Sequence, residues 1–117
     1  MSERAQSFRA YREQMNERLL EAGTLTTRRF FNLDSRCYDE GALPAATKEM
    51  LGLAASLVLR CDDCIAYHLI RCVEQGVGEA ELAEVLDVGL IVGGSIVIPH
   101  LRRARELLDE LRDGGGA

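Results

Sequence analysis

Residues 44–76 read PAATKEMLGLAASLVLRCDDCIAYHLIRCVEQG, and this stretch carries most of what the sequence says about the fold. Its first half, residues 44–59, is apolar and rich in Ala and Leu, which favour helices, and its opening proline suits a first helical turn. The two adjacent Asp residues are typical of a helix N-terminus. The stretch therefore predicts two helices, 44–59 and 62–74, joined by a tight turn near Arg60 and closed by Gly76.

The rest of the chain also predicts helices, since no segment alternates like a strand and no repeat is present. The remaining predicted helices span residues 2–22, 27–38, 80–92 and 95–111. Ser2 can cap the first of them. Gly89 and Gly93 are four residues apart on one helix face and would allow close packing, in an apolar region that reads as core or subunit interface. The fold class is all-α, with a single domain.

Composition excludes several classes of partner. The 117 residues suit one domain that readily self-associates, and the net charge of −5, from 19 acidic and 14 basic side chains, disfavours nucleic-acid binding. The basic cluster at residues 102–105 is followed at once by acidic residues and reads as a solvated helix face. The longest apolar run, residues 88–99, is far shorter than the roughly 20 residues of a membrane span. Without an apolar N-terminal segment, the chain is expected to be cytoplasmic.

The chemistry of the chain centres on Cys61, Cys64 and His68, at positions i, i+3 and i+7. At 100° per residue, the second and third lie about 60° and 20° from the first, so all three share one stripe of a helix. Cysteines three apart at a helix start are close enough for a disulfide. An imidazole four residues after Cys64 can take the thiol proton, and the helix N-terminus stabilises a thiolate, although the neighbouring Asp residues oppose this.

Two other readings of the cysteine pair stay open. The thiols could be inert core residues, or they could belong to a structural zinc site, which needs four ligands. Further ligands would have to come from His68, Cys72, Cys37 and His100, among which there is no second closely spaced pair. Redox chemistry is therefore favoured. Cys72 reads as a core thiol, Cys37 has no assignable role, and His100 reads as a surface or packing residue.

Glu49, followed by Cys61-Asp-Asp-Cys64 and then His68, resembles the signature of the carboxymuconolactone decarboxylase and AhpD-like superfamily, in its alkylhydroperoxidase-like branch. Flanking residues agree, including the segment 38–44. The resemblance implies an AhpD-like helical bundle over residues 38–112 that assembles as a homotrimer or homohexamer. It leaves residues 1–37 as a helical extension and 113–117 as an expected disordered tail.

The resemblance also implies an enzyme that reduces hydroperoxides with thiols. In it, Cys64 reacts with the peroxide, Cys61 resolves the product as a disulfide, and Glu49 and His68 form a proton relay. No metal or other cofactor is implied, and the recycling reductant is not identified. Lactone decarboxylation is not expected, because the decarboxylase members lack the dithiol.

One position departs from the family pattern. Peroxidase members often carry a second His just before the second Cys, where this chain has Asp63. An acid beside the nucleophile would raise the pKa of the Cys64 thiol and weaken attack. The cysteine pair could therefore exchange disulfides with a partner protein in place of reducing hydroperoxides. The alternative is a non-enzymatic helical oligomer whose cysteine pair senses redox state or binds metal.

Overall fold

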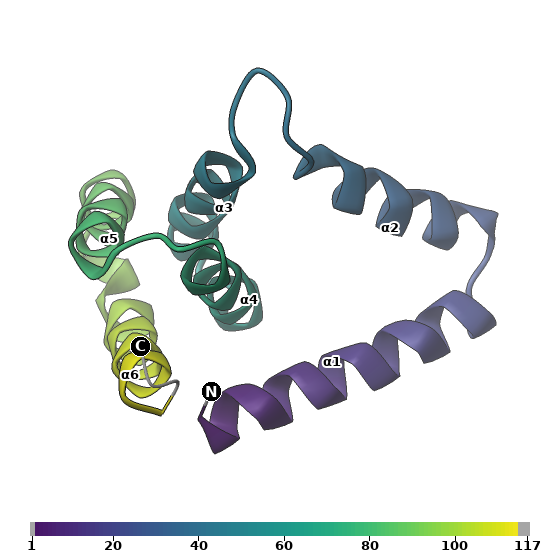
Figure 1. Ribbon diagram of the computed structural model, residues 1–117, viewed down its shortest axis with the longest axis horizontal. Coiled ribbons are helices and arrows are strands. Elements are labelled where there is room, and N and C mark those ends of the chain that lie inside the picture. Colours follow the sequence, from purple (N-terminus) through teal and green to yellow (C-terminus); the bar gives the residue numbers. More distant parts are fainter. Residues whose placement is uncertain (1, 115–117) are drawn as a thin grey trace.

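Helices form nearly all of the computed structural model, which describes residues 2–114 (Figure 1). The elements are α1 (Glu3–Ala22), α2 (Leu25–Cys37), α3 (Ala45–Leu59), α4 (Asp62–Glu74), α5 (Glu79–Gly93), the 3-10 helix η1 (Ser95–Val97) and α6 (Ile98–Gly114). Residues 2–114 contain no β-strand, so the predicted all-α class is confirmed.

The helix boundaries predicted around the cysteines are confirmed. Arg60 ends α3 in the left-handed conformation, with φ 60° and ψ 40°, and α4 begins two residues later. At the start of α1, the Ser2 hydroxyl accepts a hydrogen bond from the amide of Ala5, as expected for an N-cap. Pro44 is the N-cap of α3 and lies one residue before the first turn.

The C-terminal region differs from prediction. The single helix expected at residues 95–111 is divided, because η1 comes first and α6 begins at Ile98. Helix α6 then runs to Gly114, two residues into the expected tail 113–117, whose last three residues lie outside the described part of the chain.

The core lies between α3, α4, α5 and α6, which pack side by side (Figure 1). Fully buried leucines come from each of these helices: Leu53, Leu57, Leu69, Leu82 and Leu108. Close approach of α5 to α3 depends on Gly89, since a Cβ there would lie 2.8 Å from Cδ2 of Leu57. This is the packing role that the Gly89 and Gly93 spacing predicted. The apolar side chains around these glycines differ in their exposure: Val97 is buried, whereas Ile91 is exposed.

Helices α1 and α2 form an arm that leaves the bundle near the start of α1 and returns through residues 38–44 (Figure 1). The apolar side chains Tyr11, Leu19 and Leu20 of α1 are exposed, and no residue of α2 is buried. Phe30 and Leu33 on α2 expose 68% and 69% of their surface. The arm therefore adds little to the core. Among residues 2–114, no helix has the length and apolar character that crossing a bilayer needs.

Candidate functional site

The site is built on the helical hairpin α3–α4. Because only Arg60 and Cys61 connect the two helices, α4 folds back along α3. Glu49 lies in the first half of α3, and His68 lies midway along α4. The reversal that the sequence predicted near Arg60 therefore brings the two side chains together.

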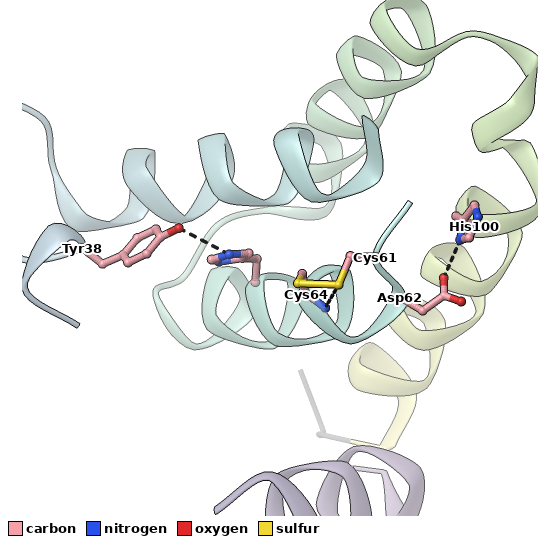
Figure 2. The surroundings of a disulfide bond; sticks show 6 residues. Tyr38, Cys61, Asp62, Cys64 and His100 are labelled. Atoms are coloured by element: carbon pink, nitrogen blue, oxygen red, sulfur yellow. Dashed lines mark hydrogen bonds and ion pairs between the residues drawn. A yellow bond between two sulfur atoms is a disulfide. The ribbon is translucent and has the colours of Figure 1, made fainter. Parts of the chain in front are cut away.

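Cys61 and Cys64 form a disulfide at the N-terminus of α4, with Cα atoms 5.3 Å apart (Figure 2). Cys61 is the N-cap residue, and its Sγ accepts a hydrogen bond from the backbone N–H of Cys64 at 3.2 Å. A sulfur thus occupies the place where Ser or Asp oxygens usually cap a helix. Cys64 is exposed, whereas Cys61 is only partly so.

Glu49 and His68 form a buried pair. Oε1 of Glu49 lies 2.8 Å from Nδ1 of His68, and the two residues expose only 1% and 8% of their surface. Arg71 approaches the other carboxylate oxygen, with Nε 3.6 Å from Oε2. Because an ionised carboxylate only accepts hydrogen bonds, we assign the hydrogen to Nδ1, which leaves Nε2 of the neutral ring as an acceptor.

His68 and the cysteines are not directly joined. In the part of the chain that the structure describes, no hydrogen bond links His68 to Cys64; instead, Nε2 of His68 lies 3.4 Å from the hydroxyl of Tyr38 (Figure 2). Helical spacing placed His68 and Cys64 on the same stripe, but it could not show that partners on other segments would take both ring nitrogens.

Two residues of the site were missed by the sequence reasoning. Tyr38 belongs to the segment 38–44 that agrees with the family pattern, but the sequence did not suggest a role for it. Gly52 lies directly under the imidazole, because a Cβ there would be 2.7 Å from Cε1 and 2.8 Å from Nε2 of His68. An isolated glycine inside a strong helical pattern indicates close packing, so the sequence could have pointed to position 52.

A cavity of about 440 Å³ opens beside the disulfide. Its lining residues are Phe8, Tyr11, Arg12, Met15, Asn16, Asp34, Asp63, Cys64, Tyr67 and His68. Cys64 and His68 thus face the same space, although no hydrogen bond joins them. The guanidinium of Arg12 lies 3.9 Å from the centre of the Tyr67 ring, a cation–π contact that fixes it at the cavity wall.

The two acids between the cysteines have different surroundings. Asp62 accepts hydrogen bonds from His100 at 2.8 Å and from Arg103 at 3.1 Å. Burial alone would raise the pKa of Asp62, but the bond from His100 and the positive charge of Arg103 outweigh it, so the pKa lies below its usual value. Asp63 lines the cavity instead. His100, for which the sequence offered no partner, is therefore paired with Asp62.

The two other cysteines lie apart from the disulfide. Cys72 is fully buried in the core, as predicted, and burial raises the pKa of its thiol to about 12. Cys37 is an exposed free thiol. Within residues 2–114, no three His, Cys, Asp or Glu side chains are grouped so that they could hold a metal ion.

Comparison with known proteins identifies the family. The carboxymuconolactone decarboxylase family matches residues 24–107. An uncharacterized protein of Cupriavidus necator is 32% identical over 72 residues, which are 62% of this chain and 64% of that protein, so the match spans less than two thirds of that relative.

Two crystal structures of one Thermotoga maritima protein are much more similar. They are 58% and 57% identical, with TM-scores of 0.89 and 0.92; the alignments cover 92% and 94% of this chain and 91% and 96% of theirs. The first is described as a carboxymuconolactone decarboxylase family protein with a suggested involvement in the antioxidative response. Fold, sequence match and these structures agree, and the chain belongs to the carboxymuconolactone decarboxylase family.

Proposed function

We propose that this protein is a thiol-dependent hydroperoxide reductase that cycles between the Cys61–Cys64 disulfide and the dithiol. The proposal rests on one arrangement: the bonded pair opens through Cys64 onto a cavity that also reaches His68, and His68 is held by buried Glu49. The antioxidative role suggested for the Thermotoga maritima relative supports it.

The two sulfurs have different roles. Cys64 is the more exposed and lines the cavity, so it is the sulfur that meets the peroxide. Cys61 caps α4 and receives a backbone N–H, and the positive end of the helix stabilises a thiolate there. A stabilised thiolate at Cys61 is ready to resolve the oxidised Cys64.

The cycle balances as follows. The Cys64 thiolate attacks the terminal oxygen of a hydroperoxide, the O–O bond breaks, and the departing alkoxide takes a proton to become an alcohol. Cys64 is now a sulfenic acid. Cys61 attacks its sulfur, the disulfide forms and water leaves. The dithiol has lost two electrons, the peroxide has gained them, and an external dithiol returns the protein to its reduced form.

Glu49 and His68 supply proton handling. Glu49 orients the ring through Nδ1, and a water in the shared cavity carries the proton between His68 and Cys64, since no hydrogen bond joins the two directly. Asp63 lies in the same cavity and works against thiolate formation at Cys64. The apolar side chains of Phe8, Tyr11 and Met15 favour an organic hydroperoxide as substrate.

The test is organic hydroperoxide consumption in the presence of a small dithiol reductant. Wild type and Cys37→Ser, which removes the exposed cysteine outside the pair, should consume peroxide at the same rate, whereas Cys64→Ser should lose the activity. Equal rates for wild type and Cys64→Ser would refute the proposal. If wild type reduces a protein or low-molecular-weight disulfide but no peroxide, the site is a disulfide oxidoreductase.

The chain also assembles with copies of itself in this proposal, as the homotrimer or homohexamer that the family resemblance implies. Leu25, Phe30 and Leu33 are exposed on α2, and Ile91 and Ile96 are exposed at the far end of the bundle. Apolar surface of this extent is typical of subunit contacts. Light scattering should give three or six times the 12.9 kDa of one chain. A monomer at micromolar concentration would contradict assembly.

A further inference from the structure

We propose that Tyr38 is a positioning residue of the site: its hydroxyl holds Nε2 of His68 in both protonation states of the imidazole. This inference rests on the proposed thiol chemistry for its functional consequence, but its structural content can be tested without that chemistry.

The geometry around His68 leaves one place for such a partner. Glu49 binds Nδ1, and Gly52 lies against the ring atoms. Of the described side chains, only the hydroxyl of Tyr38, at 3.4 Å, lies within hydrogen-bonding distance of Nε2. This separation is long for a hydroxyl hydrogen bond, as is common in resting sites. The rings of Tyr38 and His68 also pack together, with centroids 5.2 Å apart.

A tyrosine hydroxyl suits this position because it both donates and accepts hydrogen bonds. Burial, followed by the negative charges of Asp34 and Glu49, raises the pKa of Tyr38, so the hydroxyl keeps its hydrogen at neutral pH. Toward a neutral ring it donates to Nε2. When His68 takes up a proton, Nε2–H donates to the hydroxyl oxygen, and the ring need not move. His68 therefore has two partners before and after each proton transfer, and the cavity water takes the place of the hydroxyl at Nε2 only while the proton moves.

The charged groups around His68 do not offer this exchange. Glu49 on α3 is the one carboxylate bonded to the ring, and Arg71 on α4 faces the far oxygen of that carboxylate. Asp34 of α2, Arg12 of α1 and Asp63 line the shared cavity without a hydrogen bond to the ring. Each of these groups is fixed as an acceptor or as a donor, whereas the Tyr38 hydroxyl is both.

The chain provides a matched control for the test. The Tyr67 ring also lies 5.2 Å from that of His68, in an edge-on arrangement, but its hydroxyl is not bonded to the imidazole. Tyr38→Phe and Tyr67→Phe both keep a ring against His68 and both remove one hydroxyl. Only the first removes a partner of Nε2.

The first measurement is the nitrogen NMR spectrum of the His68 ring in the oxidised protein, which does not depend on activity. Tyr38→Phe should move the Nε2 resonance toward that of a nitrogen without a hydrogen-bond partner and leave Nδ1 in place, while Tyr67→Phe should leave both unchanged. An unchanged Nε2 resonance in folded Tyr38→Phe would overturn the proposal; circular dichroism establishes folding.

The second measurement is the rate of organic hydroperoxide reduction. Tyr38→Phe should be about five-fold slower than wild type, the usual effect of losing one neutral hydrogen bond, whereas Cys37→Ser, which changes the neighbouring exposed residue outside the cavity, should stay within about two-fold. Equal rates for Tyr38→Phe and Cys37→Ser would overturn the functional part of the proposal. If wild type itself reduces no peroxide, the proposed function fails, and the ring spectra still decide whether Tyr38 holds Nε2.

Discussion

Replacing Gly52 with Ala should push the imidazole of His68 out of its place. The added Cβ would lie 2.7–2.9 Å from three ring atoms, where ordinary contacts are 3.4–4 Å, so a shift of roughly 1 Å is needed. His68 exposes only 8% of its surface, and the room for its ring to move lies on the side of the cavity. The shift must stretch the 2.8 Å bond to the carboxylate of Glu49, which is itself buried.

The energies of these effects can be compared. Ala in place of Gly inside a helix stabilises by about 1 kcal/mol. Overpacking opposes this by about 1–3 kcal/mol, and a buried carboxylate that loses its hydrogen bond adds about 1–3 kcal/mol. We therefore expect Gly52→Ala to lower the free energy of unfolding by about 1–5 kcal/mol, in spite of its better helix propensity.

Urea unfolding followed by circular dichroism measures this change. Ala55→Gly, at an exposed position of the same helix, is the control for helix propensity alone and should be about 1 kcal/mol less stable than wild type. A Gly52→Ala variant as stable as wild type, or more stable, would refute the close contact between Gly52 and the ring.

Four further predictions follow from the site and its surroundings. Glu49→Gln should leave the fold intact but slow peroxide reduction at least ten-fold, since the ring loses its ionised partner; an unchanged rate in the peroxide assay would remove Glu49 from the relay. Cys61→Ser treated with one equivalent of hydroperoxide and a monothiol should form a mixed disulfide at Cys64, because the peroxide oxidises Cys64 to a sulfenic acid, the monothiol condenses with it as water leaves, and the resolving sulfur is missing. Mass spectrometry detects this adduct, and its absence would contradict attack at Cys64. Cys72, whose thiol has a pKa of about 12, should resist thiol reagents at pH 8 until the protein unfolds, whereas the exposed free thiol of Cys37 should react at once; labelling followed by mass spectrometry distinguishes the two. Pairing holds the pKa of Asp62 below its ordinary value. Because this side chain is about half exposed, its contribution to stability is small; the contribution is fully present above the ordinary pKa and is lost as pH falls through the folded pKa. The stability of Asp62→Asn should therefore fall less steeply than that of wild type below about pH 4, and an identical slope would exclude the contribution.

Local signals predicted the hairpin that carries the site. The run of Ala and Leu, the Asp pair at a helix start and Gly76 gave α3 and α4 their boundaries, because helix propensity and capping act between near neighbours. Three-residue spacing at a helix start also predicted that Cys61 and Cys64 can be joined. These features depend on backbone geometry within a few residues, and sequence reports them well.

Contacts between distant segments were the part that sequence could not give. Periodicity placed His68 on the side of Cys64, but the direction of the ring depends on Glu49 and Tyr38, which are 19 and 30 residues away. The pairing of His100 with Asp62 spans 38 residues and has no local signal. Likewise, the helix predicted at residues 2–22 is confirmed, but the sequence said nothing about whether this chain would cover its apolar side chains, of which Tyr11 and Leu19 are exposed.

The connection between α3 and α4 has a consequence for how the protein tolerates insertions. Surface connections usually tolerate changes in length, because they run outside the packed core. Here one of the two connecting residues, Cys61, carries a sulfur of the disulfide, and the other, Arg60, makes the sharp reversal. Any added residue would move the sulfur off the end of α4 or separate the two helices, so changes in length, including engineered tags, belong in residues 40–43 or at the chain ends.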